Sequence, residues 1–554
     1  MRCDSQLLLG SLLPAVIIGL TGCRIGSTTA SATPVTPVTP IPAAIDVTTY
    51  HNDNARDGLN SHEALLTLSN VSSATFGKIA FSTLDGSVDA EPLCVANILL
   101  GGKMRNVLYV VTEHDSVYAL DADTGTTLWQ KSVLGTGEVP SDAHNSGGIT
   151  PEIGITATPV IDKSQGPNGR IFLVAMSKDS GGSYHQRFHA LNLVDGSEAS
   201  GSPTEISGSF PGTGDNTQNG YVIFDPGQYA ARSALLLVNG TIYVGWTSHQ
   251  DQRPYTGWIM GYSESNLQQT QLLNVTPNGN SGAIWMCGNG LAADSAGNMY
   301  FLDANGTLDG SMDNNGFPVY GDYGNSMIKL SVTAGKLGVS DYFSPYNTQA
   351  ENAVDADFGA GGSMLLPDMT DSQGAVHHLI VGAGKDTNIY IADRDNLGKF
   401  NATTADNHNI YQEVVGGTKG GVWSSPAFFN GTLYYGGIND QLRAYPFTNA
   451  KLSNSPSSVS ATVYPYPGTT PAVSANGTSD GIVWGVESSL QHPAVLHAYD
   501  ASNLAHELYN SNQALNGRDS FGAGNKFITP LVVNGKVYIG SGNGVAIFGL
   551  LPSQ

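Results

Sequence analysis

The sequence predicts an all-β fold: an eight-bladed β-propeller of four-stranded antiparallel blades, closed by an N-terminal strand. Three observations predict it, namely the composition, an internal repeat and the complementary ends of the repeat array. The 554 residues include 68 Gly, and only 13% of them are charged. Typical globular proteins have about 7% Gly and about 25% charged residues. Many short strands joined by tight turns fit this composition better than long helices with charged faces.

The repeat unit reads as strand, Gly/Asn turn, strand, loop, strand, turn and strand. Its clearest copy is VLYVVTEHDSVYALDADTGTTLW at 107–129, and related sequences return at 424–447 and 527–550. Polar and apolar residues alternate within the expected strands, as they do in half-buried strands. Eight copies follow one another, at roughly 60 residues each, which suits four-stranded blades with loop insertions.

The two ends of the repeat array complement each other. The eighth copy stops after three strands at Leu550, and Phe76–Leu84, ahead of the first full copy, reads as a further strand. Pairing these two ends removes two exposed strand edges at once. The sequence therefore predicts a closed ring of eight blades, whereas a stacked solenoid, the structural alternative, needs no such complementary ends.

Three regions are expected along the chain: a signal peptide at 1–22, a linker at 23–45 and a single propeller at 46–554. The apolar run LLLGSLLPAVIIGL ends at LTGC, which resembles the bacterial lipobox and predicts that Cys23 carries the lipid. An ordinary secretory signal is the alternative. The Ser/Thr/Pro tract that follows has the composition of an extended spacer. By resemblance to bacterial lipoproteins, Arg24 after the cysteine favours the outer membrane of a Gram-negative bacterium.

Charge and cysteine content restrict the function further. The chain has 24 basic and 46 acidic residues, a net charge of −22. This balance argues against nucleic-acid binding, which requires a basic surface, and an acidic surface favours solubility. Cys94 and Cys287 remain after removal of the signal peptide. They either pair as a disulfide in the oxidising envelope or stay as two buried thiols.

One copy carries a recognisable signature, A-x-D-x-x-T-G-x-x-x-W, at Ala119, Asp121, Thr124, Gly125 and Trp129. It resembles the signature of the PQQ-like, or quinoprotein alcohol dehydrogenase-like, β-propeller superfamily. In that family these residues lock neighbouring blades together. Over nearly its whole mature length the chain is also similar to secreted bacterial PQQ-repeat proteins, through the segments YHNDNARDGLN, PEIGITATPVID and LIVGAGKDTNIYIADRDNLG.

The resemblance implies an axial pocket that holds pyrroloquinoline quinone (PQQ) and Ca²⁺ beneath two adjacent cysteines, but the sequence contains no adjacent cysteine pair. The scattered tryptophans favour packing between blades over a cofactor platform; those concerned are Trp246, Trp258, Trp285, Trp423 and Trp484. Asp355 and Asp357 are the candidates for cation binding. The Asp-rich run 303–316 lacks EF-hand spacing and reads as a hairpin turn. The motifs therefore do not support PQQ or Ca²⁺, and the cofactor remains open.

Two polar groups are the other candidate sites. They comprise His51, Asn52, Asp53 and Arg56 near the N-terminus, and Glu113, His114 and Glu152 farther along the chain. A carboxylate and a histidine in one pocket can perform acid–base chemistry or bind a cation. The simpler interpretations, which we favour, are a polar cap that pins the N-terminus across the ring mouth and a solvated hairpin turn.

Three functions are compatible with these features. The first is a lipid-anchored binding or scaffold protein of the cell envelope, which faces an envelope protein or a glycan. The tether, the missing cofactor motifs and the long insertions at 132–149 and 449–470 favour it, and the architecture resembles the lipidated propeller of the outer-membrane β-barrel assembly machinery. The alternative is a periplasmic PQQ-dependent dehydrogenase that oxidises an alcohol or sugar. The third is a polysaccharide hydrolase or lyase, which as an inverting hydrolase needs two suitably spaced carboxylates.

Overall fold

The computed structural model describes residues 43–144, 148–489 and 492–552. The predicted signal peptide, the lipidated Cys23 and most of the predicted linker lie outside these residues. The last residue of the predicted linker and the start of the predicted propeller contact the folded body: the backbone N–H of Ile45 donates to Asn534 Oδ1 at 2.9 Å, and Val47 forms an antiparallel bridge with Cys94.

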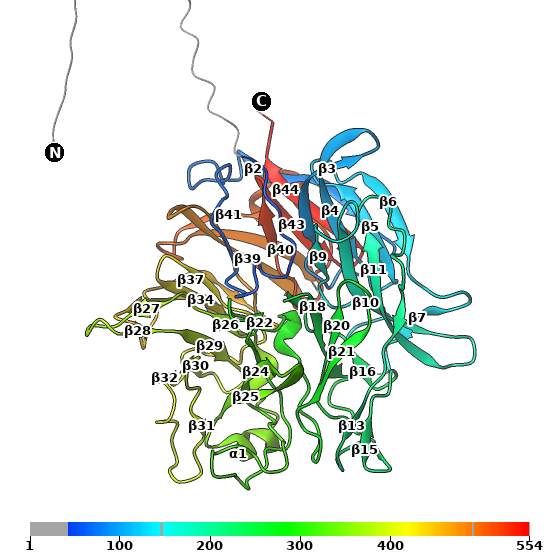
Figure 1. The fold of residues 1–554 in the computed structure, drawn as a ribbon. Coiled ribbons are helices and arrows are strands. Elements are labelled where there is room, and N and C mark those ends of the chain that lie inside the picture. Colours follow the sequence, from blue (N-terminus) through cyan, green and yellow to red (C-terminus); the bar gives the residue numbers. More distant parts are fainter. Residues whose placement is uncertain (1–42, 145–147, 490–491, 553–554) are drawn as a thin grey trace, which may run out of the picture. The chain divides into compact units, whose positions relative to one another are not determined.

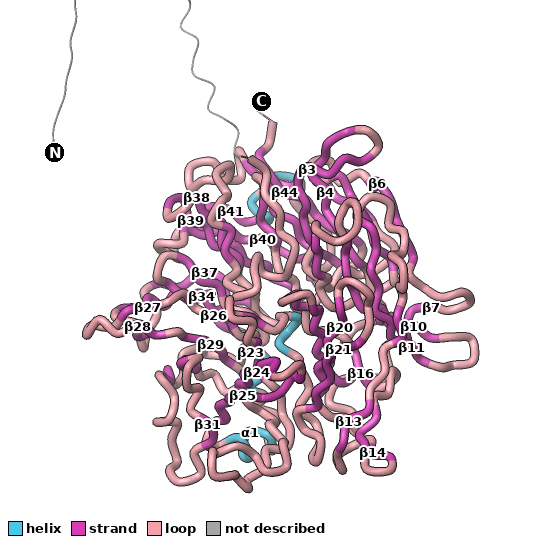
Figure 2. Tube along the Cα trace, viewed as in Figure 1, coloured by secondary structure: helices cyan, strands magenta, loops and turns pink. Residues whose placement is uncertain are grey.

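Strands and loops make up almost all of the described chain, as Figure 2 shows. The short helical segments are α1 (Thr348–Ala353), η1 (Met286–Gly288), η2 (Phe358–Ala360), η3 (Ser511–Gln513) and η4 (Leu515–Gly517). None of the helices in the described segments is long and apolar enough to cross a membrane. The all-β prediction is confirmed.

Most strands form four-strand antiparallel sheets, in which successive strands of the chain pair with each other. The first four sheets are β3 (Leu93–Leu100), β4 (Lys103–Val111), β5 (Ser116–Asp121) and β6 (Thr127–Ser132); β9 (Val160–Asp162), β10 (Arg170–Lys178), β11 (Tyr184–Asn192) and β12 (Thr204–Glu205); β17 (Leu236–Val238), β18 (Thr241–Gly245), β20 (Trp258–Ser263) and β21 (Gln269–Asn274); and β22 (Ala292–Ala293), β23 (Met299–Leu302), β24 (Met327–Thr333) and β25 (Lys336–Ser344).

The later sheets follow the same plan. They are β26 (Met364–Leu365), β29 (Leu379–Ala383), β30 (Ile389–Asp393) and β32 (Gln412–Val414); β33 (Ala427–Phe429), β34 (Thr432–Gly436), β35 (Asp440–Thr448) and β37 (Ser458–Tyr464); β38 (Ala472–Asn476), β39 (Ser479–Ser489), β40 (His492–Asp500) and β41 (Glu507–Asn510); and β42 (Leu531–Val533), β43 (Lys536–Ser541), β44 (Gly544–Leu550) and β2 (Phe76–Thr83).

The remaining short strands extend these sheets or form small hairpins in the insertions. They are β1 (Leu59–Asn60), β7 (Val139–Asp142), β8 (Glu152–Ile153), β13 (Ser209–Pro211), β14 (Thr217–Gln218), β15 (Tyr221–Ile223), β16 (Tyr229–Ala230), β19 (Thr247–Ser248), β27 (Met369–Thr370), β28 (Val376–His377), β31 (Lys399–Phe400) and β36 (Lys451–Leu452).

The predicted N-terminal closing strand, β2, pairs with the last strand, β44, as the sequence predicts. Strand β2 lies antiparallel to β44, in a register that runs from Phe76 opposite Leu550 to Thr83 opposite Gly544. Figure 1 shows the pair as a blue and a red strand side by side. Within the described residues, eight sheets succeed one another, each with four strands that pair antiparallel and some with one or two further short strands, and eight is the predicted number of repeats. The number of blades in the closed ring stays a prediction.

The residues of the repeat signature contact sheets on both sides of their own. The Asp121 carboxylate accepts the Thr124 N–H at 3.1 Å and so holds the turn, in which Gly125 has a left-handed φ of 73°. The Gly125 carbonyl accepts the Ser82 hydroxyl of β2 at 2.7 Å. The Trp129 indole donates to the Leu193 carbonyl at 3.0 Å in the next sheet. Ala119 is fully buried between these contacts.

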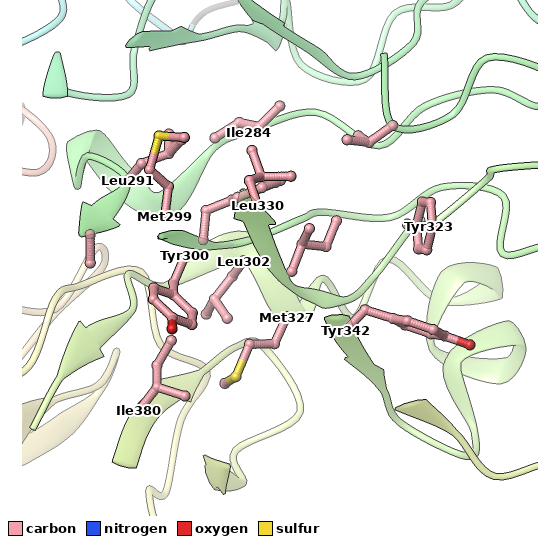
Figure 3. Close-up of a cluster of buried hydrophobic side chains, with 14 of the residues drawn as sticks. Ile284, Leu291, Met299, Tyr300, Leu302, Tyr323, Met327, Leu330, Tyr342 and Ile380 are labelled. Atoms are coloured by element: carbon pink, nitrogen blue, oxygen red, sulfur yellow. The ribbon is translucent and has the colours of Figure 1, made fainter. Parts of the chain in front are cut away.

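The hydrophobic core lies between neighbouring sheets. Figure 3 shows part of the largest cluster, in which Leu302 and Met327 of one sheet gather with Ile380 of the next. Such side chains are buried because each strand presents every second residue to the adjacent sheet. A charged side chain in this position would be costly, which explains the low proportion of charged residues.

The two cysteines of the propeller are separate buried thiols. Neither Cys94 nor Cys287 forms a disulfide. Burial raises the pKa of the Cys94 thiol to about 12, and it raises that of Cys287 as well. Of the two possibilities that the sequence left open, the structure therefore shows the buried thiols.

Candidate functional site

A cavity of about 320 Å³, here called the central cavity, lies where many sheets converge. In six of the sheets, the segment just before the first strand lines the cavity. The first strands of these sheets are β17, β22, β26, β33, β38 and β42. The residues that these segments contribute are Arg232, Trp285, Cys287, Asp355, Asp357, Ala360, Trp423, Tyr466, Lys526 and Phe527. Because the blades of a propeller surround a central channel, a cavity reached from so many sheets lies on that channel.

Three cations line the cavity, and each lies over the face of an aromatic ring. Arg232 Cζ is 4.4 Å from the centre of the Phe527 ring. Lys385 Nζ is 5.6 Å from the Trp423 ring and Lys526 Nζ is 5.7 Å from the Tyr466 ring. The aromatic rings also contact one another: the Trp423 and Tyr466 centroids are 5.8 Å apart. We call these six residues the aromatic–cation band.

Of the three acidic residues that line the cavity, two lie around Lys385 and the third is Asp251. The Lys385 ammonium donates to Asp355 Oδ1 at 2.8 Å and contacts Asp357 Oδ2 at 2.5 Å. Asp357 is 3% exposed, and burial raises its pKa to about 6 although Lys385 lowers it. The structure thus brings the two predicted cation ligands together, but a lysine side chain is bound between them.

The N-terminal segment crosses the first strands of successive sheets. Four carbonyl oxygens of the segment accept backbone N–H groups from the first strands of four sheets. The pairs are Asn54 with Ala293, Ala55 with Leu365, Asp57 with Phe428 and Gly58 with Val473. Tyr50 reaches Ser425 and Thr529, each at 3.2 Å between hydroxyl oxygens. Tyr50 also lines a second, much smaller hollow, which shares Arg232, Cys287 and Phe527 with the central cavity. The segment therefore lies across the channel next to the cavity.

Structural contacts hold three of the four predicted N-terminal candidates, His51, Asp53 and Arg56, in this segment. Arg56 is fully buried and donates to the carbonyl oxygens of Leu291 and Leu235 at 3.0 and 3.2 Å. The His51 ring is hydrogen-bonded to the carbonyl oxygens of Arg56 and Pro471, and burial lowers its pKa. Asp53 accepts the Arg56 N–H at 2.8 Å. Asn52 Oδ1 has no partner in the described part of the chain.

The second predicted group is divided between the interior and the surface. His114 Nδ1 is hydrogen-bonded to Glu152 Oε1 at 2.9 Å, and the two side chains are 44% and 27% exposed. Glu113 is 1% exposed, and its Oε2 accepts the Gly154 N–H at 2.8 Å. Burial and the nearby Asp89 charge raise the Glu113 pKa well above its usual value. Glu113 therefore does not share a pocket with the histidine.

A buried carboxyl group next to the N-terminal segment gives the fold a pH dependence. Glu91 is 4% exposed, and its Oε2 accepts the His51 backbone N–H at 2.8 Å. Burial raises its pKa to about 8, against the opposing effect of that hydrogen bond. In the unfolded chain a glutamate ionises near pH 4.3. The unfolded state therefore releases this proton first, and stability falls as the pH rises from about 4.5 to about 8.

We expect Glu91→Gln, which keeps a hydrogen-bond acceptor but cannot ionise, to remove this loss. Thermal melts should show that the variant and the wild type are nearly equally stable at pH 4.5. As the pH rises to 8, the variant should become more stable than the wild type, by on the order of a few kcal/mol. Asp368→Asn, at a side chain that is 65% exposed, serves as the control and should show no such gain. Parallel pH profiles of Glu91→Gln and the wild type would contradict the assignment.

The tryptophans expected to pack between blades occupy two different environments. Trp246, Trp258 and Trp484 are fully buried, as expected for packing, but the half-buried Trp285 and Trp423 line the central cavity. Both lie a few residues before the first strand of a repeat, as Arg232 and Phe527 do. Comparing the repeats at the positions before their first strands would have revealed this pattern.

Comparisons with known proteins place the fold. No family model and no curated protein matches the sequence. Among solved structures, quinohemoprotein alcohol dehydrogenase from Comamonas testosteroni matches with a TM-score of 0.57 and 14% identity, covering 92% of this chain and 81% of that one. The enzyme ADHIIG from Pseudomonas putida HK5 matches with a TM-score of 0.58 and 13% identity, over 93% and 84%.

The chain has the β-propeller fold of the quinohemoprotein alcohol dehydrogenases. At this level of identity the likeness concerns the fold alone. BamB from Moraxella catarrhalis matches with a TM-score of 0.46 and 11% identity, over 86% of this chain and 98% of that one. That similarity is too low to support an argument.

The resemblance implies a cofactor made of PQQ and Ca²⁺, and the cavity suits PQQ but not Ca²⁺. The aromatic–cation band offers flat faces and positive charge, which suit a planar polycarboxylate such as PQQ. Calcium requires six to eight oxygen ligands, but Asp355 and Asp357 are already paired with Lys385. No group of three or more His, Cys, Asp or Glu is arranged to hold a metal in the described segments. The residues present therefore do not fit calcium.

Proposed function

We propose that the protein is an exported, lipid-anchored binding protein of the cell envelope, whose propeller binds a small molecule in the central cavity. The molecule has a flat face and an anionic group such as a carboxylate. One observation carries the proposal: three cations, each over an aromatic ring, surround a single cavity reached from six sheets. The lipid anchor rests on the LTGC motif at Cys23.

Arg232 is the best-placed group for the anion. It is 5% exposed, lines the cavity and has an Nε without a hydrogen-bond partner in the described residues. A buried donor without a partner costs about 1–3 kcal/mol, so an oxyanion at this position would recover that cost. A guanidinium also binds a carboxylate through two parallel hydrogen bonds. The ligand's flat face would then lie against the aromatic–cation band.

A PQQ-dependent dehydrogenase is the second candidate, because PQQ is a planar polycarboxylate and suits the same band. Binding to a further envelope protein or a glycan, as the sequence suggests, is compatible with an occupied cavity. A pull-down from detergent-solubilised envelopes tests that partner. Recovery of the protein always alone and as a monomer would argue against a scaffold role.

Trp423→Ala should weaken binding of planar carboxylates at least about tenfold, because stacking on an aromatic ring contributes about 1–3 kcal/mol. Calorimetric titrations with PQQ and with trimesate, each in EDTA and again with Ca²⁺, measure the affinity. Tyr320→Ala, at a ring that is 60% exposed and does not line the cavity, should leave it unchanged. The proposal fails if neither probe binds or if both variants bind as the wild type does. Dye reduction with PQQ and an alcohol distinguishes the dehydrogenase.

A further inference from the structure

Two histidines from distant parts of the chain stack face to face next to the central cavity. The ring centroids of His144 and His249, here called the stacked histidine pair, are 4.0 Å apart, and the ring planes differ by 10°. His144 follows β7, which pairs with β10 of the second sheet, and His249 follows β19. The small hollow that His249 lines shares Arg232, Gln250 and Trp285 with the central cavity. The pair therefore joins an extension of the second sheet to a wall of the cavity.

The more deeply buried ring of the pair has no acceptor for an additional proton. His249 is 5% exposed, and its Nε2 is buried without a hydrogen-bond partner in the described residues. Burial, followed by the neighbouring His144, lowers the pKa of His249 to about 4, although a hydrogen bond to the Tyr229 main chain opposes this shift. An unperturbed histidine titrates near pH 6.5. The stacked arrangement therefore favours the neutral ring.

The charged groups around the pair do not offset the burial of the rings. Burial has the largest effect on the pKa of His144 and lowers it; Asp142 and Asp225 raise this pKa, and Lys178 lowers it. The Asp142 carboxylate accepts a hydrogen bond from the Lys178 ammonium at 2.6 Å, which offsets part of its charge. The titratable and charged groups around the two rings are Asp142, Lys178, Tyr184 and Asp225 near His144, and Asp142, Arg232 and Asp251 near His249.

The segment that carries His249 is held by few backbone contacts. Strands β16 and β19 pair over two residues each, and with no other strand of the described chain. Gln250 and Asp251 follow with left-handed φ values of 50° and 56°, a strained conformation for residues other than glycine. Both residues line the central cavity. A short ladder next to strained backbone opens more readily than a strand inside a large sheet.

We propose that the stacked histidine pair is an acid-sensitive contact, in which protonation of either ring separates the rings and releases the segment after β19. Once separated, the rings can be solvated, and two protonated imidazoles also repel each other. The released state therefore binds protons more readily than the stacked state. The contact is complete above about pH 6.5 and weakens as the pH falls towards about 4. Because Gln250 and Asp251 line the central cavity, acid changes the cavity wall whether or not a ligand is bound.

Hydrogen exchange followed by mass spectrometry tests the contact in the protein without a ligand. Exchange is measured at pH 7.5 and pH 5.0 and corrected for the pH dependence of the intrinsic chemical rate. In the wild type, the opening constant of peptides that contain residues 246–252 should rise at least about tenfold at pH 5.0. Peptides from β43 should show no such rise.

The variant His144→Phe/His249→Phe keeps two flat rings that can stack but removes both titratable groups, so it should lose the response to acid. Each single variant should show a response several-fold smaller than that of the wild type. His408→Phe, at a side chain that is 60% exposed, is the matched control and should respond as the wild type does.

Equal corrected exchange of residues 246–252 at the two pH values in the wild type overturns the inference, and so does a double variant with the full response. An equal acceleration in β43 indicates global unfolding and also overturns it. If the double variant does not fold, the single variants decide: a reduced response supports the inference, and a full response in both overturns it. Because no ligand is present, failure of the proposed ligand binding would leave these results unchanged.

Discussion

Arg56→Met is expected to lower the free energy of unfolding by about 3–5 kcal/mol, the typical cost of removing one partner from a buried charged network. The Arg56 guanidinium is fully buried. It donates to Thr49 Oγ1 at 2.7 Å and to the carbonyl oxygens of Tyr50, Leu235 and Leu291 at 3.0–3.2 Å. Methionine fills part of the volume but leaves these buried acceptors without a donor, at about 1–3 kcal/mol each before relaxation.

Urea denaturation followed by tryptophan fluorescence measures the effect. Arg253→Ala is the matched control, because the Arg253 side chain is 57% exposed and pairs with Asp215 at the surface. Exposed ion pairs contribute about 0–1 kcal/mol, so this variant should unfold near the wild-type midpoint. If Arg56→Met also unfolds near that midpoint, Arg56 does not hold the N-terminal segment across the sheets.

Phe76→Ala is expected to cost about 3–5 kcal/mol, as large-to-small changes at well-packed aromatic residues do. Phe76 opens β2 and is fully buried. Its ring centroid is 5.5 Å from that of Trp484, 5.0 Å from that of Tyr509 and 6.3 Å from that of Phe548. The same change loosens the strand that pairs with β44, so exposed edges and aggregation should follow.

Thermal melts and size-exclusion chromatography after mild heating measure both consequences. Ile79→Ala is the control on the same strand, since Ile79 is 37% exposed and its truncation should cost well under half as much. Equal losses in the two variants, or a Phe76→Ala protein that remains monomeric and as stable as the wild type, would contradict the role of β2 in closing the fold.

The closure could be predicted from the sequence because it depends on local patterns. Alternation within Phe76–Leu84 and within the last repeat marks each as a strand, and the missing strand at one end matches the extra strand at the other. The signature at Asp121 and Trp129 was equally accessible, because its turn geometry is formed by residues close in sequence.

The cavity could not be predicted in the same way. Its lining extends from Gly148 to Phe527, and such residues meet only when the sheets are arranged around the channel. Neighbouring residues also mislead: Glu113 and His114 are adjacent in sequence, but one is buried and the other lies at the surface. Asp355 and Asp357, predicted as cation ligands, both pair with Lys385, which lies 28 residues beyond Asp357 and which no sequence motif connects to them.

A crystal structure of the protein with the tighter of the two probes will show whether the central cavity binds a flat, anionic molecule. We expect the probe in the central cavity, with its carboxylate against Arg232 and its flat face against Trp423. A probe bound elsewhere, for example in the hollow lined by Phe429, Tyr434 and Asp480, with the central cavity holding only water, would contradict it.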